Sequence, residues 1–162
     1  MFKYVFQILV GILTLVVSTF IAWYEGSAII NNSIEWKYST PFTNLFNKEI
    51  MNGRDISQLD YFVYAVKFQP LLPTLMMVSI LYIVSVTGYY LMKSKSKWII
   101  GFWGLTGFIM IVFSVLIFNS STIGGSIFFW IPSISGFLYI AVAVLLWSKK
   151  LKYKRTCNAS EV

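Results

Sequence analysis

The sequence predicts an all-α integral membrane protein, a bundle of four transmembrane helices with a small outer cap between the first and the second. Apolar residues make up 57% of the 162 positions and charged residues only 12%, whereas about a quarter of the residues of a soluble protein are charged. Four uncharged apolar runs are each close to the roughly 20 residues that a helix needs to cross a bilayer. A long polar stretch separates the first two runs.

The four predicted spans cover residues 4–23, 71–91, 98–118 and 127–147 of a single membrane domain, and none contains Lys, Arg, Asp or Glu. In the fourth span, Pro132 either kinks the helix or lies in its first turn. The first span could instead be a cleaved signal peptide ending at Ala28, which would leave three spans. Its apolar stretch of about 20 residues exceeds the 7 to 15 typical of the apolar region of a signal peptide, so we expect a retained span.

Positive residues near the span ends predict the orientation, because such residues gather on the cytoplasmic side. Nine of them fall on one side of the predicted spans. Both termini are therefore expected in the cytoplasm, with a basic tail at 148–162 on anionic headgroups. Lysine outnumbers arginine eleven to two, a bias common in AT-rich bacterial genomes, so we predict a bacterial plasma membrane. The nine are Lys3, Lys93, Lys95, Lys97, Lys149, Lys150, Lys152, Lys154 and Arg155.

The predicted outer cap, residues 24–70, combines one or two short strands with a helix. The stretch "IEWKYST" from Ile34 alternates apolar and polar residues, which is the period of a strand. After it, Asp55 is predicted to cap a helix, with Gln58 at the capping-box spacing. The helix is expected on the bundle mouth, and the competing interpretation places its apolar face on the membrane surface. That face consists of Ile56, Leu59, Phe62, Val63 and Val66.

Small and polar residues recur at helical spacing on the first and third spans, a pattern that lets helices pack closely in lipid. A binding or transport path along the same residues is the alternative. Extended by one step, the stripe of the first span reaches Glu25, which then faces the bundle mouth if the helix continues past Trp23. The stripes consist of Gln7, Gly11, Thr14, Ser18 and Ala22, and of Gly101, Gly104, Gly107 and Ser114.

Several functions are made improbable by what the sequence lacks. Histidine is absent and the single cysteine, Cys157, lies in the tail, which leaves no thiol pair and few ligands for zinc. The cap has five carboxylates but no calcium-loop motif and no nucleophile motif. We therefore expect no metal, no cofactor and no catalysis, and ion pairing with the cap cations Lys37, Lys48, Arg54 and Lys67. The basic residues lie beside apolar runs, so no nucleic acid is expected.

The motifs "WYEGSA" (23–28), "EWKYS" (35–39) and "LDYFVYAVKF" (59–68) resemble a known family. The chain looks like the YjdJ-like small membrane proteins of Bacillus, a domain-of-unknown-function family, over roughly residues 1–92. The resemblance implies a bacterial membrane location and no reaction. Four spans with a strand-bearing first loop are also similar to the claudin architecture, but the paired loop cysteines of claudins are missing.

The leading functional prediction is a non-enzymatic membrane protein whose outer cap binds another membrane or envelope protein. Uncharged spans argue against coupled transport, which places ionisable residues within the membrane. The alternative is passive transport or lipid handling along the stripe of the first span. A third hypothesis, an enzyme acting through Glu25 and Glu35, is the weakest. The candidate partner or ligand contacts are Trp23, Glu25, Glu35, Trp36 and Tyr38.

Overall fold

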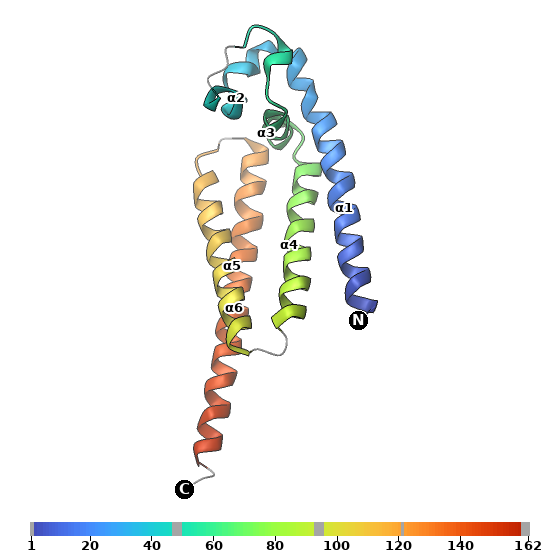
Figure 1. Ribbon diagram of the computed structural model, residues 1–162. Coiled ribbons are helices and arrows are strands. Elements are labelled where there is room, and N and C mark those ends of the chain that lie inside the picture. The colour runs from blue at the N-terminus through green and yellow to red at the C-terminus, as the bar shows by residue number, and fades with distance from the viewer. Residues whose placement is uncertain (1, 47–49, 93–95, 121, 160–162) are drawn as a thin grey trace. The chain divides into compact units, whose positions relative to one another are not determined.

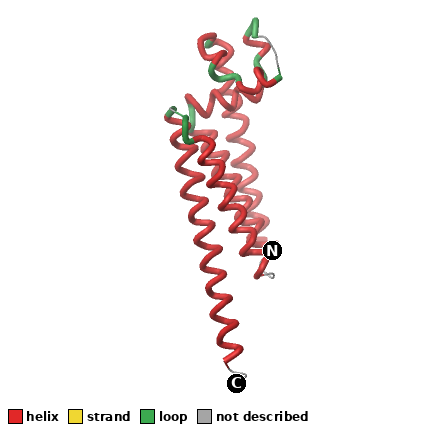
Figure 2. Tube along the Cα trace, turned by 90° about the vertical axis from the view of Figure 1, so that its left-hand side faces the viewer, coloured by secondary structure: helices red, strands yellow, loops and turns green. Residues whose placement is uncertain are grey.

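The computed structural model describes residues 2–46, 50–92, 96–120 and 122–159, with side chains described over 2–46, 50–90, 98–120 and 122–151. All regular structure in these ranges is helical, as Figures 1 and 2 show. The chain forms two compact units, one of residues 1–86 and 120–127, the other of residues 87–119 and 128–162. Some residues used in the predictions lie outside the described side chains. They are Lys48, Glu49, Lys93, Lys95, Lys97, Lys152, Lys154, Arg155 and Cys157.

Within the described ranges, four helices are long and apolar enough to cross a membrane, which confirms this part of the predicted fold class. They are α1 (Phe2–Gly26), α4 (Leu71–Met92), α5 (Ser96–Ile117) and α6 (Ile123–Ala159). Helix α6 begins four residues before the predicted start, so Pro132 lies inside it and not in its first turn. The packing of all four into one bundle stays a prediction.

In the first unit, α1 packs closely against α4. The buried residues of α1 are Gly11, Ser18, Ala22 and Gly26. A Cβ atom on Gly11 would lie 2.8 Å from Ile83 Cγ1, so the glycine lets α4 approach the α1 backbone. Helix α1 continues past Trp23 to Gly26 and carries Glu25 in its last turn.

The cap, residues 24–70, contains no strand among its described residues, so the predicted strand is wrong. Residues Ser33–Lys37 instead form the 3₁₀ helix η2, and the backbone N–H groups of Tyr38 and Ser39 bond to the carbonyl of Glu35. A strand needs a partner for its backbone groups, and no other described segment of the cap pairs with this one. The remaining elements are η1 (Ser27–Asn31), α2 (Pro41–Leu45), η3 (Gly53–Asp55) and α3 (Gln58–Phe68).

The cap helix begins later than predicted. Ser57 is the N-cap of α3, its hydroxyl accepting a hydrogen bond from the Leu59 N–H at 3.4 Å. Asp55 instead completes a capping box with Asn52 around η3. The acidic residue that marked a helix start in the sequence therefore belongs to the short turn before it.

Helix α3 lies across the ends of α1 and α4, seen end-on in Figure 1 while those helices run along the page. Two glycines of the same unit meet its backbone. A Cβ on Gly26 of α1 would lie 2.0 Å from the Tyr61 carbonyl oxygen, and one on Gly124 of α6 1.6 Å from that of Val66. Only glycine permits these backbone contacts, which fix α3 and with it the rest of the cap.

In the second unit, α5 and α6 pack through Gly107 and Gly136. A Cβ on Gly107 would lie 2.8 Å from the carbonyl oxygen of Gly136, and one on Gly136 2.9 Å from that of Gly107. The Ser114 hydroxyl of α5 donates to the Phe129 carbonyl of α6 at 2.8 Å. These contacts make the two helices a closely packed pair.

Candidate functional site

Asp60 of α3 is the polar centre of the cap. Its side chain is fully buried and accepts the backbone N–H groups of Phe42 at 2.9 Å and Thr43 at 2.8 Å. The Thr43 hydroxyl adds a third bond at 2.5 Å and itself accepts the Ser57 N–H at 2.8 Å. Pro41, at the first position of α2, has no N–H to satisfy. Asp60 thus caps α2 from a distant position in the chain, and a carboxylate there is favoured by the helix dipole.

A second carboxylate joins η2 to α3. Glu35 forms an ion pair with Lys67 and accepts the Ser39 hydroxyl at 2.7 Å. The hydrogen bond from the Lys67 ammonium, and after it the one from Ser39, holds the pKa of Glu35 below its ordinary value. Ser39 is fully buried although Glu35 and Lys67 keep some exposure. The ion pairing predicted for the cap carboxylates is thus present at Glu35.

An apolar cluster lies beside these polar contacts. Ile29, Ile56 and Tyr61 are buried together, and Trp36 packs against them. The indole N–H of Trp36 donates to the Ile29 carbonyl at 2.8 Å, which ties η2 to η1. Trp36, predicted as a partner contact, is thus largely used inside the cap.

Four large apolar side chains of η2, α2 and the residues that end them remain exposed. We call this set the η2–α2 surface and define it by Ile34, Tyr38, Leu45 and Phe46, whose exposed fractions are 78%, 70%, 74% and 60%. Ile34 and Tyr38 are four residues apart at η2, and Leu45 and Phe46 are adjacent at the end of α2. The connecting residues Ser39 and Thr40 are fully buried and hold the two elements to the cap.

Glu25 and Trp23 lie where α1 meets the cap. Trp23 is 37% exposed and its ring centroid lies 6.4 Å from that of Tyr61. The Oε2 atom of Glu25 is enclosed and has no hydrogen-bond partner among the described residues. Of the five predicted contact residues, Trp23, Glu35 and Trp36 make contacts within the first unit. Tyr38 remains exposed. The Oε2 atom of Glu25 has no hydrogen bond to a described residue.

The residues predicted to pack helices differ in their surroundings. Gly11 and Ser18 are buried in α1, and Gln7 and Thr14 are half-buried. The hydroxyls of Thr14 and Ser18 donate to carbonyls of their own helix. On α5, Gly107 touches α6, but a Cβ on Gly101 or Gly104 would meet nothing within 4 Å. Only part of the α5 stripe is therefore a packing contact in this structure.

The sequence-based site missed Asp60 as a central residue, and it missed the exposed residues of α2. Asp60 and α2 lie 17 to 18 residues apart in the chain, so no local motif joins them. Pro41 followed by an apolar residue could have indicated a short helix start. Among the residues whose side chains are described, no three His, Cys, Asp or Glu side chains form a group that could hold a metal ion.

Among the described residues, four helices are long and apolar enough to cross a membrane, and a folded helical segment connects the first two, which suggests a membrane protein with a structured first connection. The chain belongs to the family described as "Domain of unknown function (DUF4306)", whose pattern matches residues 5–92. The matched range comprises nearly all of α1, the cap and all of α4, and it confirms the resemblance found over residues 1–92.

A relative in Bacillus subtilis (strain 168), described as "Uncharacterized protein YjdJ", is 34% identical over 65 residues. The alignment covers 39% of this chain and 60% of the relative, so this chain spans less than two thirds of that protein. No solved structure matches the chain.

Proposed function

We propose that this protein is a non-enzymatic, multi-pass protein of a bacterial plasma membrane that binds another membrane or envelope protein through its cap. The observation that carries the proposal is the η2–α2 surface, which leaves four large apolar side chains at least 60% exposed. Large apolar side chains exposed close together on a folded surface commonly mark interaction sites, and within each element the pair is close in the sequence, Ile34 with Tyr38 and Leu45 with Phe46. Tyr38 and Phe46 supply the aromatic area that is enriched in such interfaces.

The polar groups of the cap support binding over catalysis. Glu35 is paired with Lys67, Asp60 is used by α2, and Asp55 accepts the N–H groups of Met51 and Asn52. A general acid or base must be free to reach a substrate proton. The carboxylates that are engaged in these contacts stabilise the cap instead.

The hypothesis of passive transport along α1 receives less support. The hydroxyls of Thr14 and Ser18 are turned to their own helix, and Gly11 is covered by Ile83 of α4. These features favour a packed seam between helices over an open path.

Photo-crosslinking in the native membrane tests the proposed function. A photoreactive phenylalanine analogue at Phe46 should give a discrete adduct with one membrane or envelope protein. The same analogue at Phe137 of α6, which is 64% exposed, controls for random encounters. The double variant Tyr38→Ser, Leu45→Ser should lose the adduct, whereas Leu59→Ser should keep it. An adduct pattern at Phe46 that matches the one at Phe137 would contradict partner binding.

The proposed orientation places the cap outside the cell and both termini in the cytoplasm. It is supported by the nine positive residues on the side of the termini and by the basic tail. A membrane-impermeant maleimide should label Cys157 only after the cells are opened. Labelling of intact cells would reverse the assignment.

A further inference from the structure

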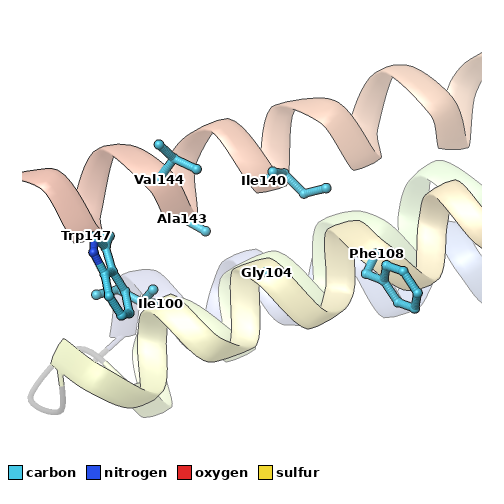
Figure 3. Close-up of a pocket in the computed structure, with 7 residues that line it drawn as sticks. All are labelled: Ile100, Gly104, Phe108, Ile140, Ala143, Val144 and Trp147. Carbon is cyan, nitrogen blue, oxygen red and sulfur yellow. The ribbon is translucent and has the colours of Figure 1, made fainter.

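The helix pair α5–α6 carries an open groove outside the cap. Its volume is about 390 Å³, within the usual range of small-molecule sites. Helix α5 lines it with Ile100, Gly104 and Phe108, at steps of four residues. Helix α6 lines it with Ile140, Ala143, Val144 and Trp147 (Figure 3). All of these residues belong to one compact unit.

Small residues form the floor of the groove and aromatic residues form its ends. Phe108 and Trp147 are 62% and 57% exposed. Ala143 has only a methyl group, and a Cβ on Gly104 would meet no atom within 4 Å. The groove therefore exists because Gly104 leaves unfilled the space that a larger side chain would occupy.

A positively charged residue, Lys150, follows the groove-lining residues of α6 in the sequence. On α6 the lining residues Ala143 and Trp147 are four apart, and Lys150 comes three residues later, which keeps it on the same helix face. Lys150 is half-buried, about 4.5 Å along the helix axis from Trp147. Lys149 points about 100° away from that face. Neither lysine has an ion-pair partner among the described side chains.

We propose that the α5–α6 groove binds an anionic phospholipid. One acyl chain lies along Gly104 and Ala143, and the phosphate contacts Lys150. The apolar lining suits a hydrocarbon chain, and a lysine near the membrane surface attracts anionic headgroups. The site shares no residue with the cap, and the proposal does not depend on a partner of the cap.

The charges at this end favour a lipid over a second copy of the chain. From residue 92 to residue 155 every charged residue is Lys or Arg. A second copy in the same orientation would bring further cations to Lys150, and like charges in contact are unfavourable. A phospholipid brings both the apolar chain and the negative charge.

Native mass spectrometry of the full chain provides the test, with phosphatidylglycerol and phosphatidylcholine of identical acyl chains as probes. The wild-type protein should retain the anionic lipid preferentially. Gly104→Leu, which fills the groove, should lower retention of phosphatidylglycerol at least tenfold. Gly101→Leu is the matched control, because a Cβ there also meets nothing within 4 Å and the residue does not line the groove. Lys150→Gln should reduce the preference for phosphatidylglycerol more than Lys149→Gln does.

A second measurement does not depend on the folding of any variant. Phosphatidylglycerol with a photoreactive group in one acyl chain should label wild-type peptides containing residues 100–108 and 140–147. Labelling spread evenly over the four spans would overturn the proposal. Equal retention of the two lipids by the wild type, or undiminished retention by Gly104→Leu, would do the same. Loss of a dimer in Gly104→Leu with unchanged lipid retention would assign the groove to a second copy instead.

Discussion

Replacement of Asp60 by Asn changes one atom of a fully buried side chain and should loosen the start of α2. Asp60 accepts two backbone N–H groups and one hydroxyl, at 2.5 to 2.9 Å. A carboxamide retains one acceptor oxygen and turns an NH₂ group toward donors. At least one buried donor then lacks a partner, which costs about 1–3 kcal/mol. The lost charge at the helix N-terminus adds about 0.3–1 kcal/mol.

We therefore expect local opening of α2 to become about 2 kcal/mol easier in Asp60→Asn, which corresponds to roughly 30-fold faster amide exchange. Hydrogen–deuterium exchange of a peptide covering residues 41–46 measures this directly, through the N–H groups of Phe42 and Thr43. Peptides from the middle of α5 should exchange as in the wild type.

Asp55→Asn is the matched control for this experiment. Asp55 also accepts two backbone N–H groups, those of Met51 at 3.1 Å and Asn52 at 2.8 Å, but these bonds are exposed. Water can replace the lost acceptor there, so the change should be small. The proposed role of Asp60 would be refuted if the amides of residues 41–46 exchanged at the wild-type rate in Asp60→Asn. It would also be refuted if Asp60→Asn and Asp55→Asn changed these exchange rates equally, because burial of Asp60 would then not explain the stability of α2.

Two further predictions concern the contacts that hold the cap. Gly26→Ala should lower the stability of the detergent-solubilised protein by about 1–3 kcal/mol, because the new methyl group meets the Tyr61 carbonyl. Gly101→Ala is the control and should leave the stability unchanged, because a Cβ at Gly101 meets no atom within 4 Å. Equal shifts of the thermal unfolding midpoint in the two variants would contradict the role of the Gly26 contact. Because the folded-state pKa of Glu35 is lowered, its ion pair with Lys67 stabilises the cap above the ordinary pKa of 4.5 and is lost as the pH falls through the lowered value. Acidification slows the intrinsic exchange of every amide, so the quantity to compare is the protection factor, the ratio of intrinsic to observed exchange rate. Protection factors around η2 should fall on such acidification in the wild type and not in Glu35→Gln.

The spans could be predicted from the sequence because their signal is local and strong. Each run of about 20 apolar residues satisfies the length rule by itself. The ends were less certain, because a helix can continue into polar sequence where tertiary contacts support it. Helix α1 extends to Gly26 because the glycine allows α3 to pack on its last turn. The spacing of the stripe did predict that Ser18 and Ala22 share a face, and both are buried.

The cap was harder to predict because distant residues decide its structure. The alternation from Ile34 to Ser39 fits a strand, yet it is equally compatible with a short helix in which Glu35 and Ser39 lie one turn apart. The hydrogen bonds of Glu35 to Ser39 and Lys67 select the helix. The ion-pair hypothesis identified the correct type of contact for Glu35 but not for Asp60, whose partners are backbone N–H groups.

The internal use of these carboxylates determines how functional variants must be interpreted. A variant of Asp60 or Glu35 loosens the cap and thereby displaces the η2–α2 surface, so loss of partner binding in such a variant reports on folding. Variants of Tyr38 and Leu45 remove exposed apolar area without breaking a side-chain hydrogen bond or ion pair among the described residues of the cap. If amide exchange at residues 41–46 stays at the wild-type rate in Leu45→Ser while the Phe46 adduct disappears, the surface itself makes the contact. If exchange and adduct change together, the loss follows from unfolding of α2 and the surface is not yet implicated.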